Sequence, residues 1–329
     1  MKKKIILTVI AVVLGMASAV AQQIAVVSGS GSTSIYQTFE AAINGAEPGS
    51  VIYLPGGGFP LPDSVKITKK LTIIGIGHKS TNDNVDGYTT IPGNVFFNEG
   101  SSGSGIMGCL ITGNVCIGHD DASVNNILVK CCNVNAIDSR VNCENIVISQ
   151  NYIRNPSPIR GCGSVVTNNI LHSLYDMNSS TICYNIITSA YSWKYLWSST
   201  MYNVDNTNIH NNIIFNTGAD GPSYACDNIQ ANRNMFININ WGDNCVNLTD
   251  CSWEDIFVNY NGGAINPMSD FHFKAAYLQY SDIGIYGGSG FNDHQTAPVP
   301  YIVAKRIAEQ TDAEGKLKVQ IRVNAGPSN

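Results

Sequence analysis

An asparagine recurs down the middle of this chain, each time three residues after an apolar, branched residue. The instances are Ile111-Thr-Gly-Asn114, Ile148-Ser-Gln-Asn151, Val166-Thr-Asn-Asn169, Ile182-Cys-Tyr-Asn185, Ile209-His-Asn-Asn212 and Ile229-Gln-Ala-Asn232. Val129-Lys-Cys-Cys132 fits the same position with cysteine in place of asparagine. Successive steps run from 16 to 27 residues, a period typical of a solenoid in which each coil adds a few short strands.

A single coil shows why asparagine suits this position. Ile146 and Ile148 alternate with Val147, which indicates a strand with one face turned inward, and Tyr152-Ile153 forms a second short strand. Asn151 lies at the bend between the two strands, where asparagine tolerates left-handed backbone geometry. Because coils stack about 4.8 Å apart, equivalent asparagines lie above one another and their amides can form a hydrogen-bonded ladder. The repeat therefore predicts architecture and does not mark catalytic residues.

The amino terminus has the pattern of an export signal. Three lysines precede an apolar run from Ile5 to about Met16, followed by the small-residue cleavage pattern Ala17-Ser-Ala19. The run is too short to span a bilayer. We expect residues 1–21 to be a signal peptide and the mature protein to be secreted or periplasmic, or associated with the cell surface.

Composition narrows the possible partners. Only 13% of residues are charged and the formal net charge is −5, which argues against a nucleic-acid binder with a basic face. The abundant asparagine, glycine and serine suit tight turns, and they also suit uncharged ligands such as sugars. We expect a monomer with no membrane span. The ten cysteines are spread along the coils, where we expect small buried thiols, with one or two disulfides as the alternative.

The flanks of the repeat resemble a known family. The segment from Ile35 to Pro55, with Leu71-Thr-Ile-Ile-Gly-Ile-Gly77 after it, resembles the opening of right-handed parallel β-helix proteins of the pectin-lyase-like group. The resemblance implies a short helix over residues 36–44 that caps the first coil. Its apolar face would carry Phe39, Ala42 and Ile43.

The tail shows a similar likeness. Asp270-Phe-His-Phe and Ser281-Asp-Ile-Gly-Ile-Tyr-Gly-Gly288 resemble the closing coil of secreted bacterial β-helix proteins. Two alternating segments follow, over residues 302–307 and 317–323, and predict a hairpin-like cap. We expect an all-β chain: a single-stranded right-handed parallel β-helix over residues 22–296 with an N-terminal capping helix, and a C-terminal β cap over residues 297–329.

Catalytic motifs of this fold are incomplete. A hydrolase of the polygalacturonase type needs grouped carboxylates, but Asn203-Val-Asp205 and His119-Asp-Asp121 stand in the wrong order and Gly-His-Gly and Arg-x-Lys are absent. The segment from Arg154 to Asn169 is similar to a pectate lyase segment, and the similarity implies Arg154 as the base and Arg160 as a carboxylate binder. One residue too many separates the two arginines, and the Trp-Ile-Asp-His motif and the upstream calcium-binding aspartates are missing.

The longest step of the repeat, from Asn185 to Asn212, carries an aromatic insertion, Tyr191-Ser-Trp-Lys-Tyr-Leu-Trp197. Insertions in solenoid coils often form a binding wall. Trp193, Tyr195 and Trp197 would share one side of an extended strand, where aromatic rings stack on sugars. Lys194 and Asp205 could bond hydroxyl groups. The alternative is that these aromatics pack their loop against its own coil.

We therefore expect an exported protein that engages polysaccharide as a binding or surface protein. Two alternatives stay open. One is a polysaccharide lyase, an enzyme class that usually uses calcium; otherwise no cofactor or metal is expected. The other is a structural adhesin whose flat sheets bind a protein partner.

Overall fold

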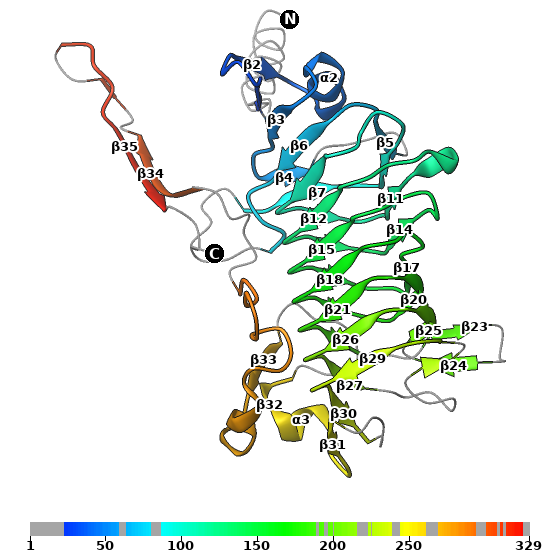
Figure 1. The fold of residues 1–329 in the computed structure, drawn as a ribbon. Helices are drawn as coiled ribbons and strands as arrows, with labels where there is room; N and C mark the ends of the chain where they lie inside the picture. Colours follow the sequence, from blue (N-terminus) through cyan, green and yellow to red (C-terminus); the bar gives the residue numbers. More distant parts are fainter. Residues whose placement is uncertain are drawn as a thin grey trace, which may run out of the picture.

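The computed structural model describes residues 23–58, 64–79, 87–188, 191–193, 197–199, 201–215, 223–224, 226–238, 244–260, 269–293, 301–307, 310–311 and 314–324. The chain is predominantly β, with parallel strands stacked coil upon coil (Figure 1). This arrangement is consistent with the predicted all-β solenoid. The predicted signal peptide lies outside the described residues.

Two long sheets run through the stack. The first sheet follows the order β2 (Thr33–Tyr36), β1 (Ile24–Val27), β3 (Ser50–Tyr53), β6 (Leu71–Ile74), β9 (Gly105–Met107), β12 (Leu128–Lys130), β15 (Val147–Ser149), β18 (Val165–Thr167), β21 (Thr181–Cys183), β26 (Asn208–His210), β29 (Gln230–Asn232). The second follows β4 (Gly57–Gly58), β7 (Thr89–Ile91), β10 (Leu110–Ile111), β13 (Asn133–Val134), β16 (Tyr152–Ile153), β19 (Ile170–Leu171), β22 (Ile186–Ile187), β27 (Ile213–Phe215), β30 (Met235–Ile237), β31 (Val246–Leu248). All pairings in both sheets are parallel except those of β1 with β2 and β3.

Two shorter parallel sheets complete the coils. The third sheet comprises β5 (Ser64–Ile67), β8 (Asn94–Phe97), β11 (Val115–Ile117) and β14 (Ile137–Ser139). The fourth comprises β17 (Ser157–Pro158), β20 (Leu174–Asn178), β25 (Met201–Asp205) and β28 (Ser223–Tyr224). A single parallel bridge between Ser139 and Ile159 connects them. We call the outer surface of these two sheets the third face.

Alternation along each strand fills the interior. In the first sheet Val129, Ile148, Val166, Ile182 and Ile209 are register partners and are fully buried. Their neighbours on either side point to the outer face, because successive strand residues face opposite ways. Stacking these rows removes apolar surface from water along the whole axis, which stabilises the stack by about 25 cal/mol for each Å² buried.

The asparagine ladder is present. Asn151, Asn169, Asn185, Asn212 and Asn234 are all fully buried. From Asn169 onward, each side-chain oxygen accepts a hydrogen bond from the backbone N–H of the preceding asparagine, over 2.9–3.0 Å. The amide of each of the first four also donates to the next rung over 2.9–3.0 Å. Cys132 continues the stack, its N–H donating to Asn151 Oδ1 at 2.8 Å, as predicted from its position.

Two predicted rungs are placed elsewhere. Asn232 is exposed on β29, and Asn234 takes the rung because Ala231, and not Ile229, is the register partner of Ile209. Asn114 follows the second sheet and belongs to another ladder at the next corner of the coil. In this second ladder Asn114 N donates to Asn94 Oδ1, Asn135 Nδ2 to Asn114 Oδ1, and Asn155 Nδ2 to Asn135 Oδ1.

The bend at the first ladder is made by the residue before each asparagine. These residues have left-handed backbone conformations, and we call them the left-handed row: Gln150 (φ 58), Asn168 (φ 53), Tyr184 (φ 58), Asn211 (φ 57) and Arg233 (φ 54). Asparagine thus serves the ladder through its side-chain hydrogen bonds, whereas its neighbour adopts the positive φ. Our expectation that the ladder asparagines themselves take the left-handed conformation was wrong.

The C-terminal part of the chain covers the outer side of the second sheet. It contains α3 (Trp253–Ile256), β32 (Phe257–Asn259), β33 (Asp270–Phe273) and the 3₁₀ helix η2 (Ala275–Tyr280). Phe257, Phe271 and Ile285 form a second apolar cluster with Ile170 and Ile213, which are residues of the second sheet. Figure 1 places these elements on the side of the stack away from β20 and β25.

Residues 282–290, which we call the strap, lie along the left-handed row. Asn168 Nδ2 donates to the carbonyl oxygens of Ile285 and Gly287, both at 2.8 Å, and Gln150 Nε2 donates to that of Gly290 at 2.9 Å. Asn211 Nδ2 donates to Asp282 O at 3.0 Å. Arg233 forms an ion pair with the Asp282 carboxylate. The strap therefore runs back along the coils in the reverse of their chain order.

The two ends carry smaller elements. Near the amino terminus, α2 (Phe39–Gly45) begins three residues later than the predicted helix and buries Phe39, Ala42 and Ile43. At the other end, β34 (Tyr301–Ile307) and β35 (Val319–Asn324) form an antiparallel hairpin that is a two-stranded sheet of its own. That either element caps the stack stays a prediction.

The ten cysteines are free thiols. Burial raises the pKa of Cys132 to about 12 and that of Cys131 to about 11, so both are protonated and unreactive at neutral pH. Cys109 lies in the ladder position one coil before Cys132, because Ile106 is the register partner of Val129. The prediction of small buried thiols therefore holds for Cys109, Cys131, Cys132, Cys143 and Cys183, whereas Cys162 is exposed and the other four are partly exposed.

Candidate functional site

Ionisable side chains lie on the third face, where outward positions of successive strands align. Lys66, Phe96, Cys116 and Asp138 are consecutive register partners on β5, β8, β11 and β14. The residues that alternate with them, such as Val95 and its equivalents, are buried. The row thus has a lysine at one end, on β5, and an aspartate at the other, on β14.

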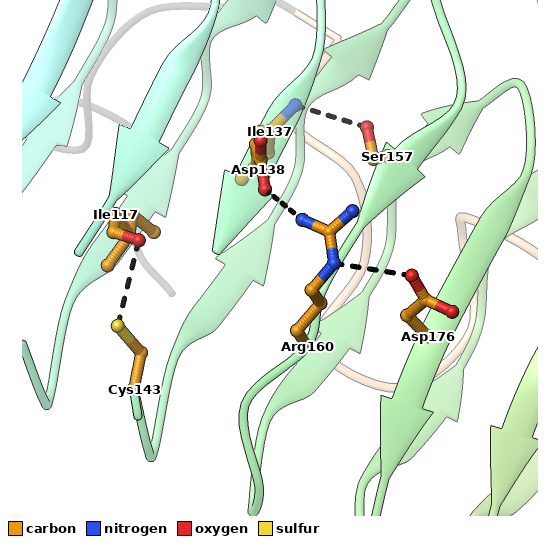
Figure 2. A network of polar contacts seen from close by, with 7 residues as sticks. All are labelled: Ile117, Ile137, Asp138, Cys143, Ser157, Arg160 and Asp176. Atoms are coloured by element: carbon orange, nitrogen blue, oxygen red, sulfur yellow. Dashed lines mark hydrogen bonds and ion pairs between the residues drawn. The ribbon is translucent and has the colours of Figure 1, made fainter. Parts of the chain in front are cut away.

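Arg160 joins two carboxylates from neighbouring coils (Figure 2). Its Nη1 lies 2.7 Å from Asp138 Oδ1, and its Nε lies 3.2 Å from Asp176 Oδ2. Asn203 on β25 donates from Nδ2 to Asp176 Oδ1 at 2.8 Å. The three charged side chains are each about a quarter to a third exposed, so this network stands at the surface of the third face. We call these four residues the Arg160 network.

Tyrosines stand next to this network. Tyr175, Tyr202 and Tyr224 are register partners on β20, β25 and β28, so their backbones follow one another at the coil spacing of about 4.8 Å. Tyr175 and Tyr202 are partly exposed. The guanidinium of Arg160 lies 6.0 Å from the centroid of the Tyr175 ring, within the range of a cation–π contact. Tyr175 and the Arg160 network therefore share one surface.

The aromatic insertion leaves the stack between β22 and β25. It contains the antiparallel pair β23 (Tyr191–Trp193) and β24 (Trp197–Ser199), in which Trp193 and Trp197 are direct register partners. The insertion is thus a hairpin and not one extended strand. It projects from the same side of the stack as β20 and β25 (Figure 1). Lys194 and Tyr195, the other predicted residues of this insertion, lie outside the described residues.

Two residues predicted for the site make contacts within the coils. Asp205, proposed to bond sugar hydroxyls, accepts with Oδ1 from the backbone N–H of Asp227 at 2.8 Å. Arg154, the base implied by the lyase resemblance, donates from Nε to Val134 O at 3.2 Å and from Nη2 to Ile111 O at 3.1 Å. Arg154 thus donates to carbonyl oxygens of the two preceding coils, away from the Arg160 network.

His119 and Asp120 form a second polar group at the other end of the third face. They lie in η1 (His119–Asp121), where Asp120 and Asp121 have positive φ values of 62° and 58°. His119 Nδ1 is 2.9 Å from Asp120 Oδ1, and the His119 ring lies 4.3 Å from that of Phe96. The adjacent acidic pair considered for a hydrolase is thus held in a local turn.

Sequence reasoning missed Asp138, Asp176 and the tyrosine row. The signal was available in the alignment of coils, because Leu174-Tyr175 and Met201-Tyr202 begin equivalent strands. That alignment is hidden by the long insertion before β25, which changes the spacing between the two tyrosines.

Within the part of the chain that the structure describes, no group of three or more histidine, cysteine, aspartate or glutamate side chains is arranged to hold a metal ion. Over the same residues, no helix is long and apolar enough to cross a bilayer. No protein family model matches this chain, and no curated protein or solved structure matches it either. The geometry of the third face is therefore the basis on which function has to be inferred.

Proposed function

We propose that this protein is an exported right-handed parallel β-helix protein of the pectin-lyase-like group that binds polysaccharide on its third face. The observation that carries the proposal is the register of Tyr175, Tyr202 and Tyr224 on successive coils, in a row whose first member, Tyr175, lies beside the Arg160 network. An aromatic row that repeats over three successive coils matches a ligand that is itself a repeating chain.

The chemistry of the two parts is complementary. Tyrosine rings offer flat apolar faces that stack on the C–H face of a pyranose, and their hydroxyls form hydrogen bonds at the rim. The carboxylates of Asp138 and Asp176 and the amide of Asn203 supply acceptors and donors for sugar hydroxyls. The β23–β24 hairpin, which carries Trp193 and Trp197, would form a wall at one end of this surface.

The contacts of the two arginines support binding over β-elimination. A base must lose its proton to abstract one from a uronate. Arg160 contacts the carboxylates of Asp138 and Asp176, and Arg154 donates to backbone carbonyl oxygens. Both guanidinium groups thus donate to groups of the protein itself, so the lyase alternative has no base directed at a substrate among the residues that suggested it.

The test is a glycan array followed by titration calorimetry with the best ligand. We expect wild type to bind, and the double variant Tyr175→Ala/Tyr202→Ala to lose about tenfold or more in affinity, since each stacked aromatic contributes about 1 kcal/mol. Tyr53→Ala, at an exposed tyrosine on β3, is the matched control and should bind like wild type.

Two outcomes would count against the proposal. Absence of polysaccharide binding by wild type would refute the proposal and favour a protein partner. Val147 and Val165 on the first sheet, which are partly exposed, offer a flat outer surface for such a partner. Equal binding by the double variant and wild type would remove the third face from the assignment.

A further inference from the structure

The third face carries an excess of negative charge around the tyrosine row. On the described residues of β14, β17, β20, β25 and β28 and of the turns that follow them, five carboxylates stand against two guanidinium groups. The carboxylates are Asp138, Glu144, Asp176, Asp205 and Asp227, and the guanidinium groups are Arg140 and Arg160. A ligand lying along this surface meets a field that repels anions.

Among the described residues, Arg160 is the cation that contacts Tyr175, and its charge is already compensated. Arg160 contacts Asp138 at 2.7 Å and Asp176 at 3.2 Å, and these distances leave its charge compensated on two sides (Figure 2). An incoming carboxylate could reach the guanidinium only by displacing one of these partners. It would then also stand beside the displaced carboxylate, and the repulsion would offset the new pair.

A neutral sugar meets no such penalty. Ionised carboxylates accept hydrogen bonds from hydroxyl groups, and Asp138 and Asp176 keep acceptor capacity beyond their single contacts with Arg160. Charged acceptors form stronger hydrogen bonds with hydroxyl donors than neutral ones do. The same pair of aspartates therefore favours hydroxyl-rich, uncharged rings and disfavours uronates.

We infer that the ligand of the third face is an uncharged polysaccharide, and that the aspartates beside Arg160 exclude uronate chains. The inference rests on the proposed function and adds the substrate class. It separates this surface from the uronate chemistry that the lyase alternative requires.

The experiment compares an array of neutral polysaccharides with an array of polyuronates at about 50 mM salt, where surface charges are little screened. We expect wild type to bind neutral polymers, and to bind polyuronates with an affinity at least about tenfold lower. In Asp138→Asn/Asp176→Asn, which leaves Arg160 uncompensated, we expect polyuronate binding to rise by about tenfold, because a gain of about 1.4 kcal/mol is tenfold in affinity.

Glu144→Gln is the matched control, because it lowers the negative charge of the same face without touching the partners of Arg160. It should not acquire polyuronate binding. Circular dichroism and thermal melting establish that each variant is folded. Wild type that binds polyuronates as well as neutral polymers would overturn the inference and leave the proposed function standing. A folded double variant that still rejects polyuronates would also overturn it, whereas wild type that binds neither class would refute the proposed function itself.

Discussion

At the scale of single residues, spacing predicted a ladder but not every one of its members. Asn151, Asn169, Asn185 and Asn212 were predicted and lie on it. The pattern of an apolar residue followed three positions later by asparagine also occurs at the next corner of the coil, which is why Asn114 was misplaced. The two corners differ in which sheet the preceding strand joins. The three-residue spacing carries no information on strand pairing.

The ladder makes its central rungs sensitive to truncation. Asn169→Ala removes the acceptor for the N–H and the amide of Asn151, leaving buried polar groups without partners. We expect a loss of roughly 2 to 4 kcal/mol in the free energy of unfolding, measured by urea denaturation. Asn155→Ala, in the exposed part of the second ladder, is the control and should cost less than about 1 kcal/mol. Equal losses in the two variants would mean that burial of the ladder does not determine the loss in the free energy of unfolding.

At the scale of elements, the strap was the least predictable feature. It resembles a closing coil in sequence but adds no strand to the described sheets. Its contacts with Gln150 and Asn168 use backbone carbonyl oxygens. Such contacts join residues more than 110 positions apart and leave no periodic trace in the sequence. The glycines of the strap are the visible signal, because two of them lie against Tyr184.

A pair of glycine variants isolates that contact. Gly288 and Gly290 both have left-handed backbones, with φ values of 60° and 76°. A Cβ on Gly288 would lie 2.8 Å from Tyr184 Cε2, whereas a Cβ on Gly290 would meet nothing within 4 Å. We expect Gly290→Ala to cost about 1 kcal/mol for its backbone alone and Gly288→Ala to cost clearly more. Limited proteolysis of the strap should rank them in the same order, and similar rates would contradict the packing argument.

At the scale of the whole molecule, the architecture was predictable and the ligand surface only in part. The repeat period and the alternation within each strand predicted stacked parallel strands, because both are local. The insertion between β22 and β25 was also local and was predicted. The Arg160 network brings Asp138, Asp176 and Asn203 together from separate coils, and its composition follows only from strand register.

The stability of the whole chain should depend on pH through His78. This side chain is buried against the edge of the Tyr152 ring, and burial lowers its pKa from 6.5 to about 3. The unfolded chain therefore binds a proton that the folded chain rejects, so stability is complete above pH 6.5 and falls as the pH decreases toward 3. Between pH 7 and pH 5 we expect this group to cost about 2 kcal/mol, measured by urea denaturation. In His78→Leu that part of the pH dependence should disappear; an unchanged slope would refute the assignment.

The strap has a consequence for how the chain comes apart. A solenoid held only by neighbouring coils can fray from its ends, one coil at a time, because each coil depends on the next alone. Residues 282–290 bind side chains of the left-handed row from Gln150 to Arg233, and thus tie together coils that do not touch one another. Losing any one of these coils also loosens the strap from the others. The strap therefore converts a row of semi-independent units into a block that melts cooperatively.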